Sequence, residues 1–167
     1  MLIGLSGAGK TSVAPHAARL LNSAWCDLDQ RVVAQAGLSI PEIFVAHGEA
    51  HFRKLERAAM AAALAEAPQV IATGGGWAAE PGNLAAIAGR TLVIYLSLSP
   101  IEAGRRLGGL RDRPLLEVES PERRMTELLA VRERWYRLAD IEIAVGEASP
   151  DVVAAGIATA ARQYGGW

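Results

Sequence analysis

The sequence predicts an α/β fold built on a parallel β-sheet, and two observations favour this class. Short apolar runs alternate with helical patterns along the chain, as in sheets whose strands are joined by helices. A glycine-rich loop also lies between the first apolar run and the first helical segment. The 167 residues, 51% of them hydrophobic, suffice for one full core, so we expect a single domain over 1–167.

Five apolar runs are the expected strands, and they cover 1–5, 24–27, 70–73, 92–96 and 141–145. The second run contains Cys26, the only cysteine, which we expect to be a small buried residue rather than a catalytic thiol. A single cysteine cannot form an internal disulfide, and it fits a reducing cytosol.

Serine caps mark several expected helix starts, namely Ser39, Ser99, Ser120 and Ser149. The first two belong to capping boxes with a glutamate three residues later, and the last two precede a proline. Residues 10–21 and 49–66 are also expected helices, and Gly48 is expected to break the helix before the second one. Pro15 lies inside the first of these helices, where we expect a kink or a loosened turn.

The glycine-rich loop at 4–11 reads Gly-Leu-Ser-Gly-Ala-Gly-Lys-Thr, which is the Walker A pattern. Between a strand and a helix, such a loop turns its backbone N–H groups toward phosphate oxygens. Lys10 can reach the β- and γ-phosphates, and the Thr11 hydroxyl can bind Mg²⁺. The loop therefore predicts a nucleotide phosphate site but does not identify what receives the phosphate.

Charge and hydropathy narrow the expected partners. The formal net charge is −1, so no global basic field favours nucleic acid. No segment is long and apolar enough to span a membrane, and the N-terminus lacks the basic region and apolar length of a signal peptide. We therefore expect a cytoplasmic protein without nucleic acid or membrane partners, and the charge is compatible with a monomer.

Asp27-Leu28-Asp29 is expected to close the second strand. Strand alternation would place both carboxylates on one side of the C-terminal edge, where ligands of open α/β sheets bind. One carboxylate can then approach Mg²⁺, and the other can accept a proton from a substrate hydroxyl or orient it. The alternative is a solvated strand end or a helix cap.

Arg53 has Glu49 four residues before it and Glu56 three residues after it, so the three can share a helix face. The two carboxylates could hold the guanidinium ready for an anionic substrate, or the group could be ordinary surface ion pairs of little energy. Arg132, on a later helix, is either a second anion-binding arginine or a solvated residue.

Three consecutive glycines, Gly74, Gly75 and Gly76, follow the third expected strand. Without side chains they let a ligand approach backbone N–H groups closely, although a plain flexible turn is the alternative. Trp77 comes next, and it either walls the substrate pocket or packs on a neighbouring helix.

Segment 107–120 contains two glycines, several charges and Pro114 without clear periodicity, which is typical of a mobile lid. Arg113 within it could reach the γ-phosphate and stabilise the charge of a transition state.

These motifs together resemble the shikimate kinase family. The phosphate loop, the Asp27-x-Asp29 pair, Glu49-x-x-Phe52-Arg53-x-x-Glu56, the glycine triplet, Arg113-Pro-Leu-Leu and Arg132-x-x-x-Tyr136 occur in the order and spacing of that family. The resemblance spans essentially the whole chain. It implies the P-loop fold of nucleoside monophosphate kinases, a three-layer α/β sandwich with a five-stranded parallel sheet of order 2-3-1-4-5, flanking helices and a mobile lid.

The resemblance also implies a reaction, in which ATP phosphorylates the 3-hydroxyl of shikimate with Mg²⁺ on the route to aromatic amino acids. ATP would be bound by Gly7, Ala8, Gly9, Lys10, Thr11 and Ser12, with Arg106 and Pro150 beside the adenine. Thr11 and Asp27 would hold Mg²⁺, the aspartate through water. Shikimate would be bound by Asp29, Arg53, Gly74, Gly75, Gly76 and Arg132. The catalytic residues would be Lys10, Asp29 as the candidate base, and Arg113 as the lid arginine.

Two other functions stay open at this point. One is a related small-molecule kinase, such as a gluconate kinase, for which Arg53 and Arg132 would equally suit a carboxylate. The other is a nucleotide-responsive regulatory module that kept the fold and lost turnover. The glycine triplet and Arg113-Pro-Leu-Leu favour shikimate, and every position expected to carry chemistry is filled.

Overall fold

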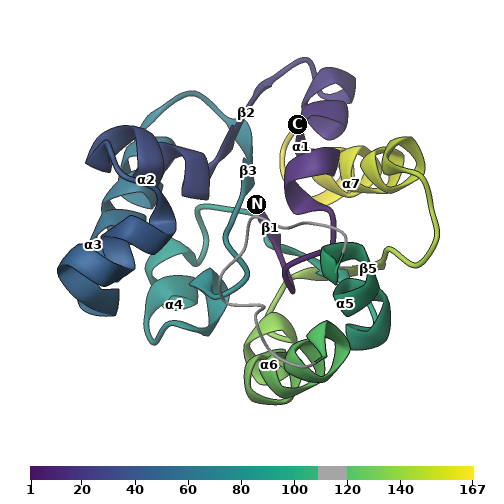
Figure 1. Cartoon of the computed structure of the whole chain (residues 1–167). Coiled ribbons are helices and arrows are strands. Elements are labelled where there is room, and N and C mark those ends of the chain that lie inside the picture. The colour runs from purple at the N-terminus through teal and green to yellow at the C-terminus, as the bar shows by residue number, and fades with distance from the viewer. Residues whose placement is uncertain (109–119) are drawn as a thin grey trace.

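A computed structural model describes residues 1–108 and 120–167 of the chain (Figure 1). Within these residues five parallel strands form one sheet of order β2-β3-β1-β4-β5, as predicted. The strands are β1 (Leu2–Ile3), β2 (Ala24–Asp27), β3 (Gln69–Ala72), β4 (Ile94–Ser97) and β5 (Ile141–Ala144). Residues 109–119, which include Arg113 and most of the expected lid, lie outside the described residues.

Helices connect the strands and lie on both faces of the sheet (Figure 1). They are α1 (Lys10–Leu20), α2 (Leu28–Ala36), α3 (Ile40–Ala65), α4 (Asn83–Ile87), α5 (Pro100–Gly108), α6 (Pro121–Tyr136) and α7 (Pro150–Tyr164), together with a 3₁₀ turn, η1 (Trp77–Ala79). Three pairs pack against each other: α1 with α7, α2 with α3, and α5 with α6. The arrangement is the three-layer sandwich that the family resemblance implied.

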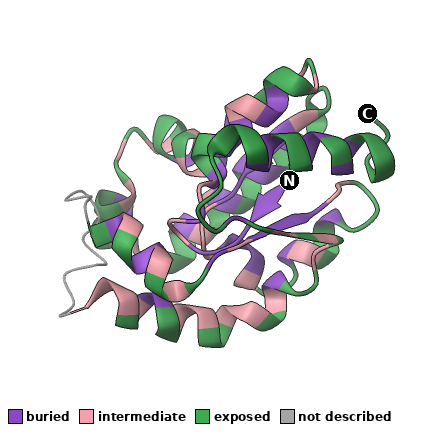
Figure 2. Cartoon of the chain, turned by 90° about the vertical axis from the view of Figure 1, so that its right-hand side faces the viewer, coloured by how far each residue is buried: buried purple, intermediate pink, exposed green. Residues whose placement is uncertain are grey.

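The strands follow the apolar runs because the central part of the sheet is buried on both faces. Leu2 and Ile3 of β1 are 1% and 0% exposed, and β3 and β4 are buried along almost their whole length. At the edge, β5 alternates half-buried and exposed residues instead. Figure 2 shows the buried residues along the sheet and on the inward faces of the helices. Cys26 is buried in β2 as a free thiol, as predicted.

The predicted helix caps are largely confirmed. The Ser39 hydroxyl accepts the Glu42 N–H, and the Glu42 carboxylate accepts the Ser39 N–H, which completes the capping box of α3. The hydroxyls of Ser120 and Ser149 likewise cap α6 and α7. The helix α3 begins at Ile40, directly after the predicted Ser39 cap, and it is interrupted at Gly48, whose φ of 77° and ψ of 172° are not helical. The break at Gly48 was predicted from the sequence.

The first helix runs from Lys10 to Leu20 with Pro15 inside it, and Figure 1 shows it as one continuous helix. In the described part of the chain, no helix is long and apolar enough to cross a membrane.

Gly104 sits where α5 and α6 approach most closely, and we predict that Gly104→Ala destabilises the fold. A Cβ there would lie 2.5 Å from both N and Cα of Glu122, which are backbone atoms of α6. We expect a loss of about 1–3 kcal/mol in the free energy of unfolding, measured by denaturant titration.

Gly156→Ala in α7 is the matched control, because a Cβ there would meet only the Ile143 Cδ1 at 3.6 Å, an ordinary contact. This variant should instead gain up to about 1 kcal/mol from helix propensity. Equal effects at the two positions would contradict the close packing of α5 on α6.

Candidate active site

The phosphate loop joins β1 to α1 and is packed tightly from behind. A Cβ on Gly4 would lie 2.5 Å from the backbone oxygen of Leu96, so only glycine fits there. Gly9 has a φ of 84° and forms the N-cap of α1, which directs the first N–H groups of the helix into the loop. The loop therefore has the shape of an anion site at a helix N-terminus.

Lys10 lies in the loop rather than in solvent. Its Nζ donates to the backbone oxygens of Gly4 and Leu5, each over 2.8 Å, and the residue is 6% exposed. Ala8 is buried, Gly7 and Gly9 are half-buried, and Ser12 is exposed at the start of α1. The predicted phosphate-binding residues thus form one continuous loop and helix start.

Thr11 and Asp27, the two predicted Mg²⁺ ligands, lie side by side. The Thr11 hydroxyl donates to Oδ2 of Asp27 over 2.6 Å. The other carboxylate oxygen, Oδ1, accepts the N–H of Gln30 and so caps α2, which keeps the buried carboxylate in place. In the described residues, no group of three or more His, Cys, Asp or Glu side chains could form a metal cage.

These oxygen donors fit Mg²⁺, because this ion usually takes one or two protein ligands and completes its shell with water and substrate phosphates.

Asp29 lies close to the expected place but on a different element. The strand β2 ends at Asp27, and Asp29 is in the first turn of α2. Asp29 therefore reaches the site from the start of a helix. The prediction that it lies on the strand, on the same side as Asp27, was wrong. A Cβ on Gly74 would lie 2.7 Å from Oδ1 of Asp29, so the carboxylate rests directly on the first glycine of the triplet.

The glycine triplet is the meeting point of the site rather than a plain flexible turn. A Cβ on Gly75 would lie 2.8 Å from the Ser6 Oγ and 2.9 Å from the Ser6 N, within the phosphate loop. A Cβ on Gly76 would lie 3.2–3.3 Å from the two terminal nitrogens of Arg53 and 3.5 Å from Nη2 of Arg132. The triplet thus contacts, in order, Asp29, the phosphate loop and the two arginines.

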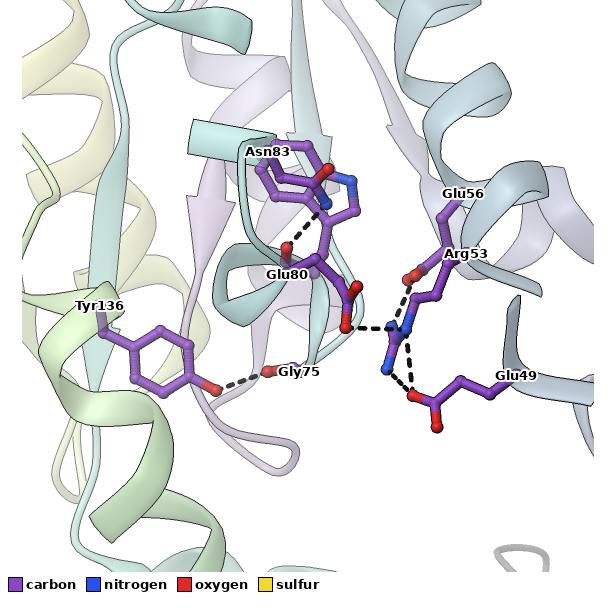
Figure 3. Close-up of polar contacts among 8 residues, drawn as sticks. Glu49, Arg53, Glu56, Gly75, Glu80, Asn83 and Tyr136 are labelled. Atoms are coloured by element: carbon purple, nitrogen blue, oxygen red, sulfur yellow. Dashed lines mark hydrogen bonds and ion pairs between the residues drawn. The ribbon is translucent and has the colours of Figure 1, made fainter. Parts of the chain in front are cut away.

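Arg53 is held by three carboxylates, as Figure 3 shows. Its Nη1 donates to Glu56 over 2.6 Å, and its Nη2 and Nε donate to Glu49 over 2.8 and 3.2 Å. The third carboxylate belongs to Glu80, whose Oε1 lies 3.2 Å from Nε. The Arg53 side chain is 14% exposed and that of Glu56 is 2% exposed, so this is not a surface ion pair.

Burial raises the pKa of the Glu56 carboxyl above its ordinary value, although Arg53 acts in the opposite direction. The Asp29 and Glu80 carboxylates add to the rise. Several negative groups therefore lie close together here, and Arg53 pairs with three of them, Glu49, Glu56 and Glu80.

Arg132 and Tyr136 reach the triplet from α6. Arg132 is half-buried, and its Nη2 faces Gly76 together with Arg53. One turn later, the Tyr136 hydroxyl donates to the backbone oxygen of Gly75 (Figure 3). Tyr136 is 1% exposed, and burial raises its pKa to about 12. The helix thus supplies both an arginine beside Gly76 and a hydrogen bond to the glycine loop, residues 74–80 after β3.

Arg106 and Pro150 lie on the other side of the phosphate loop. Arg106 donates to the backbone oxygens of Gly7 and Gly146, and it pairs with Glu102 on its own helix. Gly146 belongs to the connection between β5 and α7, and Pro150 is the exposed first residue of α7. The structure therefore brings Arg106 beside this connection, where it contacts Gly146, four residues before Pro150.

A family model described as shikimate kinase matches residues 6–162. The chain belongs to the shikimate kinase family. A shikimate kinase of Caldanaerobacter subterraneus is 42% identical over 154 residues, which cover 92% of this chain and 90% of that protein. A shikimate kinase of Geobacter metallireducens is 39% identical over 155 residues, or 92% of this chain and 87% of that protein.

Solved structures agree with the sequence relatives. The shikimate kinase of Acinetobacter baumannii in complex with shikimate superposes with a TM-score of 0.89 at 33% identity, covering 97% of this chain and 91% of that chain. The shikimate kinase of Aquifex aeolicus gives a TM-score of 0.84 at 31% identity, over 98% and 97% of the two chains. The shared fold is that of the nucleoside monophosphate kinases.

Within this shikimate kinase fold, two contacts were not predicted from the sequence. The pairing of Glu80 with Arg53 crosses between elements, and no spacing in the sequence signals it. The bond from Tyr136 to Gly75 joins residues 61 positions apart. Only the second had a sequence signal, because Tyr136 follows Arg132 by one helical turn and so shares its face.

Tyr136→Phe tests the hydrogen bond that joins α6 to the glycine loop. Loss of one buried hydroxyl donor should lower the free energy of unfolding by about 1 kcal/mol at pH 8. Because the folded phenol has a pKa of about 12, above the ordinary value of 10, its stabilising contribution is complete below pH 10. The difference between wild type and variant should therefore shrink as the pH rises from 10 toward 12.

Tyr95→Phe is the matched control, because the Tyr95 ring stacks on that of Tyr136 with centroids 5.1 Å apart. It should change stability less at pH 8, as measured by the same denaturant titration. A Tyr136→Phe variant as stable as wild type at pH 8 would contradict the hydrogen bond.

Proposed function

We propose that this chain transfers the γ-phosphoryl group of ATP to the 3-hydroxyl of shikimate, giving shikimate 3-phosphate and ADP. One observation carries the proposal beyond family membership. The glycine triplet brings a carboxylate, two guanidinium groups and the phosphate loop into contact at three successive residues. A hydroxylated carboxylic acid placed on this triplet would meet a partner for each of its groups and lie beside the phosphate donor.

On the donor side, the amides of residues 7–12 and Lys10 hold the ATP phosphates, and Arg106 and Pro150 lie beside the adenine. Thr11 and Asp27 would hold Mg²⁺, for which the pair of oxygen donors 2.6 Å apart is a fitting set. When bound there, Mg²⁺ supplies charge neutralisation between the phosphates.

On the acceptor side, Arg53 and Arg132 bind the shikimate carboxylate. Both guanidinium groups face Gly76, which supports this assignment. The backbone of the glycine triplet contacts the body of the substrate, and Asp29 accepts a hydrogen bond from the reacting hydroxyl. The half-buried position of Asp29 against Gly74 supports its role.

The transfer itself needs positioning and charge stabilisation more than covalent help from the protein. The 3-hydroxyl oxygen forms the new bond to the γ-phosphorus while the bond from that phosphorus to the β,γ-bridging oxygen breaks. The hydroxyl proton passes to Asp29, and the electron pair of the broken bond stays on ADP. Lys10 offsets the charge on the phosphates, and Arg113, which lies outside the described residues and is assigned from the family resemblance alone, would do the same.

We also propose that the enzyme acts as a cytoplasmic monomer without nucleic acid or membrane partners. The net charge of −1 and the single cysteine, free and buried, support this setting.

A coupled ADP-release assay with Mg-ATP tests the reaction. Shikimate, gluconate and a nucleoside monophosphate would be compared as acceptors at equal concentration, and only shikimate should release ADP above the background ATPase rate. Turnover confined to gluconate or a nucleotide would overturn the proposal, and no turnover with any acceptor would favour a regulatory module.

Asp29→Asn should reduce kcat on the order of 10²–10⁴-fold, because the amide cannot take up the hydroxyl proton. The affinity for ATP, measured by calorimetric titration, should stay close to that of wild type, since Asp29 lies against Gly74 on the side of the site where the acceptor would bind. A kcat near that of wild type would remove Asp29 from the mechanism.

A further inference from the structure

We propose that Glu80 is a positioning residue that fixes Arg53 against the glycine triplet and so sets the preference for an acceptor with a carboxylate. The inference deepens the proposed function and rests on it. Glu80 is not among the residues that the family resemblance implies. It directly follows η1, the 3₁₀ turn that begins right after the triplet, and its carboxylate lies 3.2 Å from Nε of Arg53 (Figure 3).

The Arg53 guanidinium has two sides with different surroundings. Its terminal nitrogens Nη1 and Nη2 are the atoms closest to Gly76, which puts this end toward the second arginine, Arg132. Its Nε is contacted by Glu80 and Glu49 on the opposite side. Nη1 and Nη2 also donate to Glu56 and Glu49, but each carries a second N–H. Glu80 therefore holds the guanidinium at Nε, and the second N–H groups of the terminal nitrogens are available to a carboxylate beside Gly76.

Glu80 differs from the other two carboxylates in the element that carries it. Glu49 and Glu56 belong to α3, like Arg53 itself, so they follow the arginine wherever the helix lies. The helix α3 packs chiefly on α2. Glu80 comes from the glycine loop, so its ion pair links Arg53 to the surface on which the acceptor would rest.

The loop that carries Glu80 is itself well fixed. Trp77 is 1% exposed, and its backbone oxygen accepts the side-chain N–H of buried Asn83 over 2.9 Å. The backbone N–H groups of Glu80 and Asn83 donate to Trp77 and Glu80 respectively, which closes two consecutive turns. Glu80 thus projects from a fixed turn four residues after Gly76, and it can therefore hold the Arg53 side chain in one position.

A simple charge argument predicts the opposite effect. The site already contains Asp29, Glu49 and Glu56, so removal of one more carboxylate would make it less repulsive to an anionic acceptor. Positioning and repulsion therefore give opposite signs for the same substitution. The direct contact favours positioning, because Glu80 lies 3.2 Å from Arg53 and the two side chains are only 28% and 14% exposed, so solvent does little to weaken the ion pair.

Glu80→Gln decides between the two effects. We expect the shikimate KM to rise about fivefold to twentyfold, with kcat and the ATP KM within about twofold of wild type. The carboxamide of shikimate has no charge for Arg53 to bind, so the kcat/KM of the variant for this acceptor should be close to that of wild type. The ratio of kcat/KM for shikimate to kcat/KM for the carboxamide should therefore fall. If Glu80 had a purely structural role, its substitution would lower kcat/KM for both acceptors by the same factor, and this result would contradict the proposal.

Two further variants complete the experiment. In an Arg53→Met background, Glu80→Gln should have no additional effect on the shikimate KM, because the residue acts through Arg53. Glu142→Gln removes an ion-paired carboxylate outside the site, which pairs with Arg137 at 2.7 Å from the edge strand β5, and should leave all constants unchanged. A lower shikimate KM in Glu80→Gln would show that Glu80 competes with the substrate and would overturn the positioning role.

Calorimetric titration of shikimate into wild type and Glu80→Gln keeps this proposal separate from the proposed function. Wild type that binds shikimate without turnover would refute the reaction, while weaker binding by the variant would still support Glu80. Wild type that does not bind shikimate would overturn both.

Discussion

The site depends on one constraint, which is that the chain after β3 must pass other groups at distances that leave no room for a side chain. Two successive residues meet this condition, because a Cβ on Gly74 or Gly75 would come within 2.7–2.8 Å of Asp29 or the phosphate loop, and at Gly76 a Cβ would be crowded by Arg53 at 3.2 Å. The parallel sheet causes this crowding because neighbouring strands end at the same edge. The three glycines relieve it because they carry no side chains. The donor and acceptor halves of the site are close because this backbone is bare.

The arginine at the third glycine shows how such a site is balanced electrostatically. A guanidinium that must bind an anion has to be ordered beforehand, and ordering a long side chain costs conformational entropy. Three carboxylates around Arg53 provide that order, and one of them, Glu56, is nearly completely buried. The raised pKa of Glu56, caused first by its burial, reflects the cost of keeping this charge out of water.

The sequence was sufficient for whatever is local in it. The strand positions, the caps at Ser39, Ser120 and Ser149 and the break at Gly48 agree with the prediction, because each depends on periodicity or on a few neighbouring residues. The strand order also agrees, but it was implied by the family resemblance and not by any local pattern. The position of Asp29 on α2 was missed because its neighbour Asp27 both ends β2 and caps the next helix, which switches the chain from strand to helix between the two carboxylates. The contacts of Glu80 and Tyr136 span 27 and 61 positions, and the only local signal for either is the helical spacing of Tyr136 from Arg132, which does not identify Gly75 as the partner.

Trp77 connects the hydrophobic core to the site, and its burial decides between the two positions that the sequence left open, in a pocket wall or packed on a neighbouring helix. It does not wall a pocket open to solvent, because it is 1% exposed and belongs to the core. Among the described residues its Nε1 has no hydrogen-bond partner, which costs about 1–3 kcal/mol. Burial of a ring of this size stabilises by roughly 4–6 kcal/mol, so the core gains from the residue in spite of the unpaired N–H. A bulky buried ring directly after three glycines stops the flexibility that the glycines would otherwise give the loop, and the turn that follows can therefore hold Glu80 against Arg53.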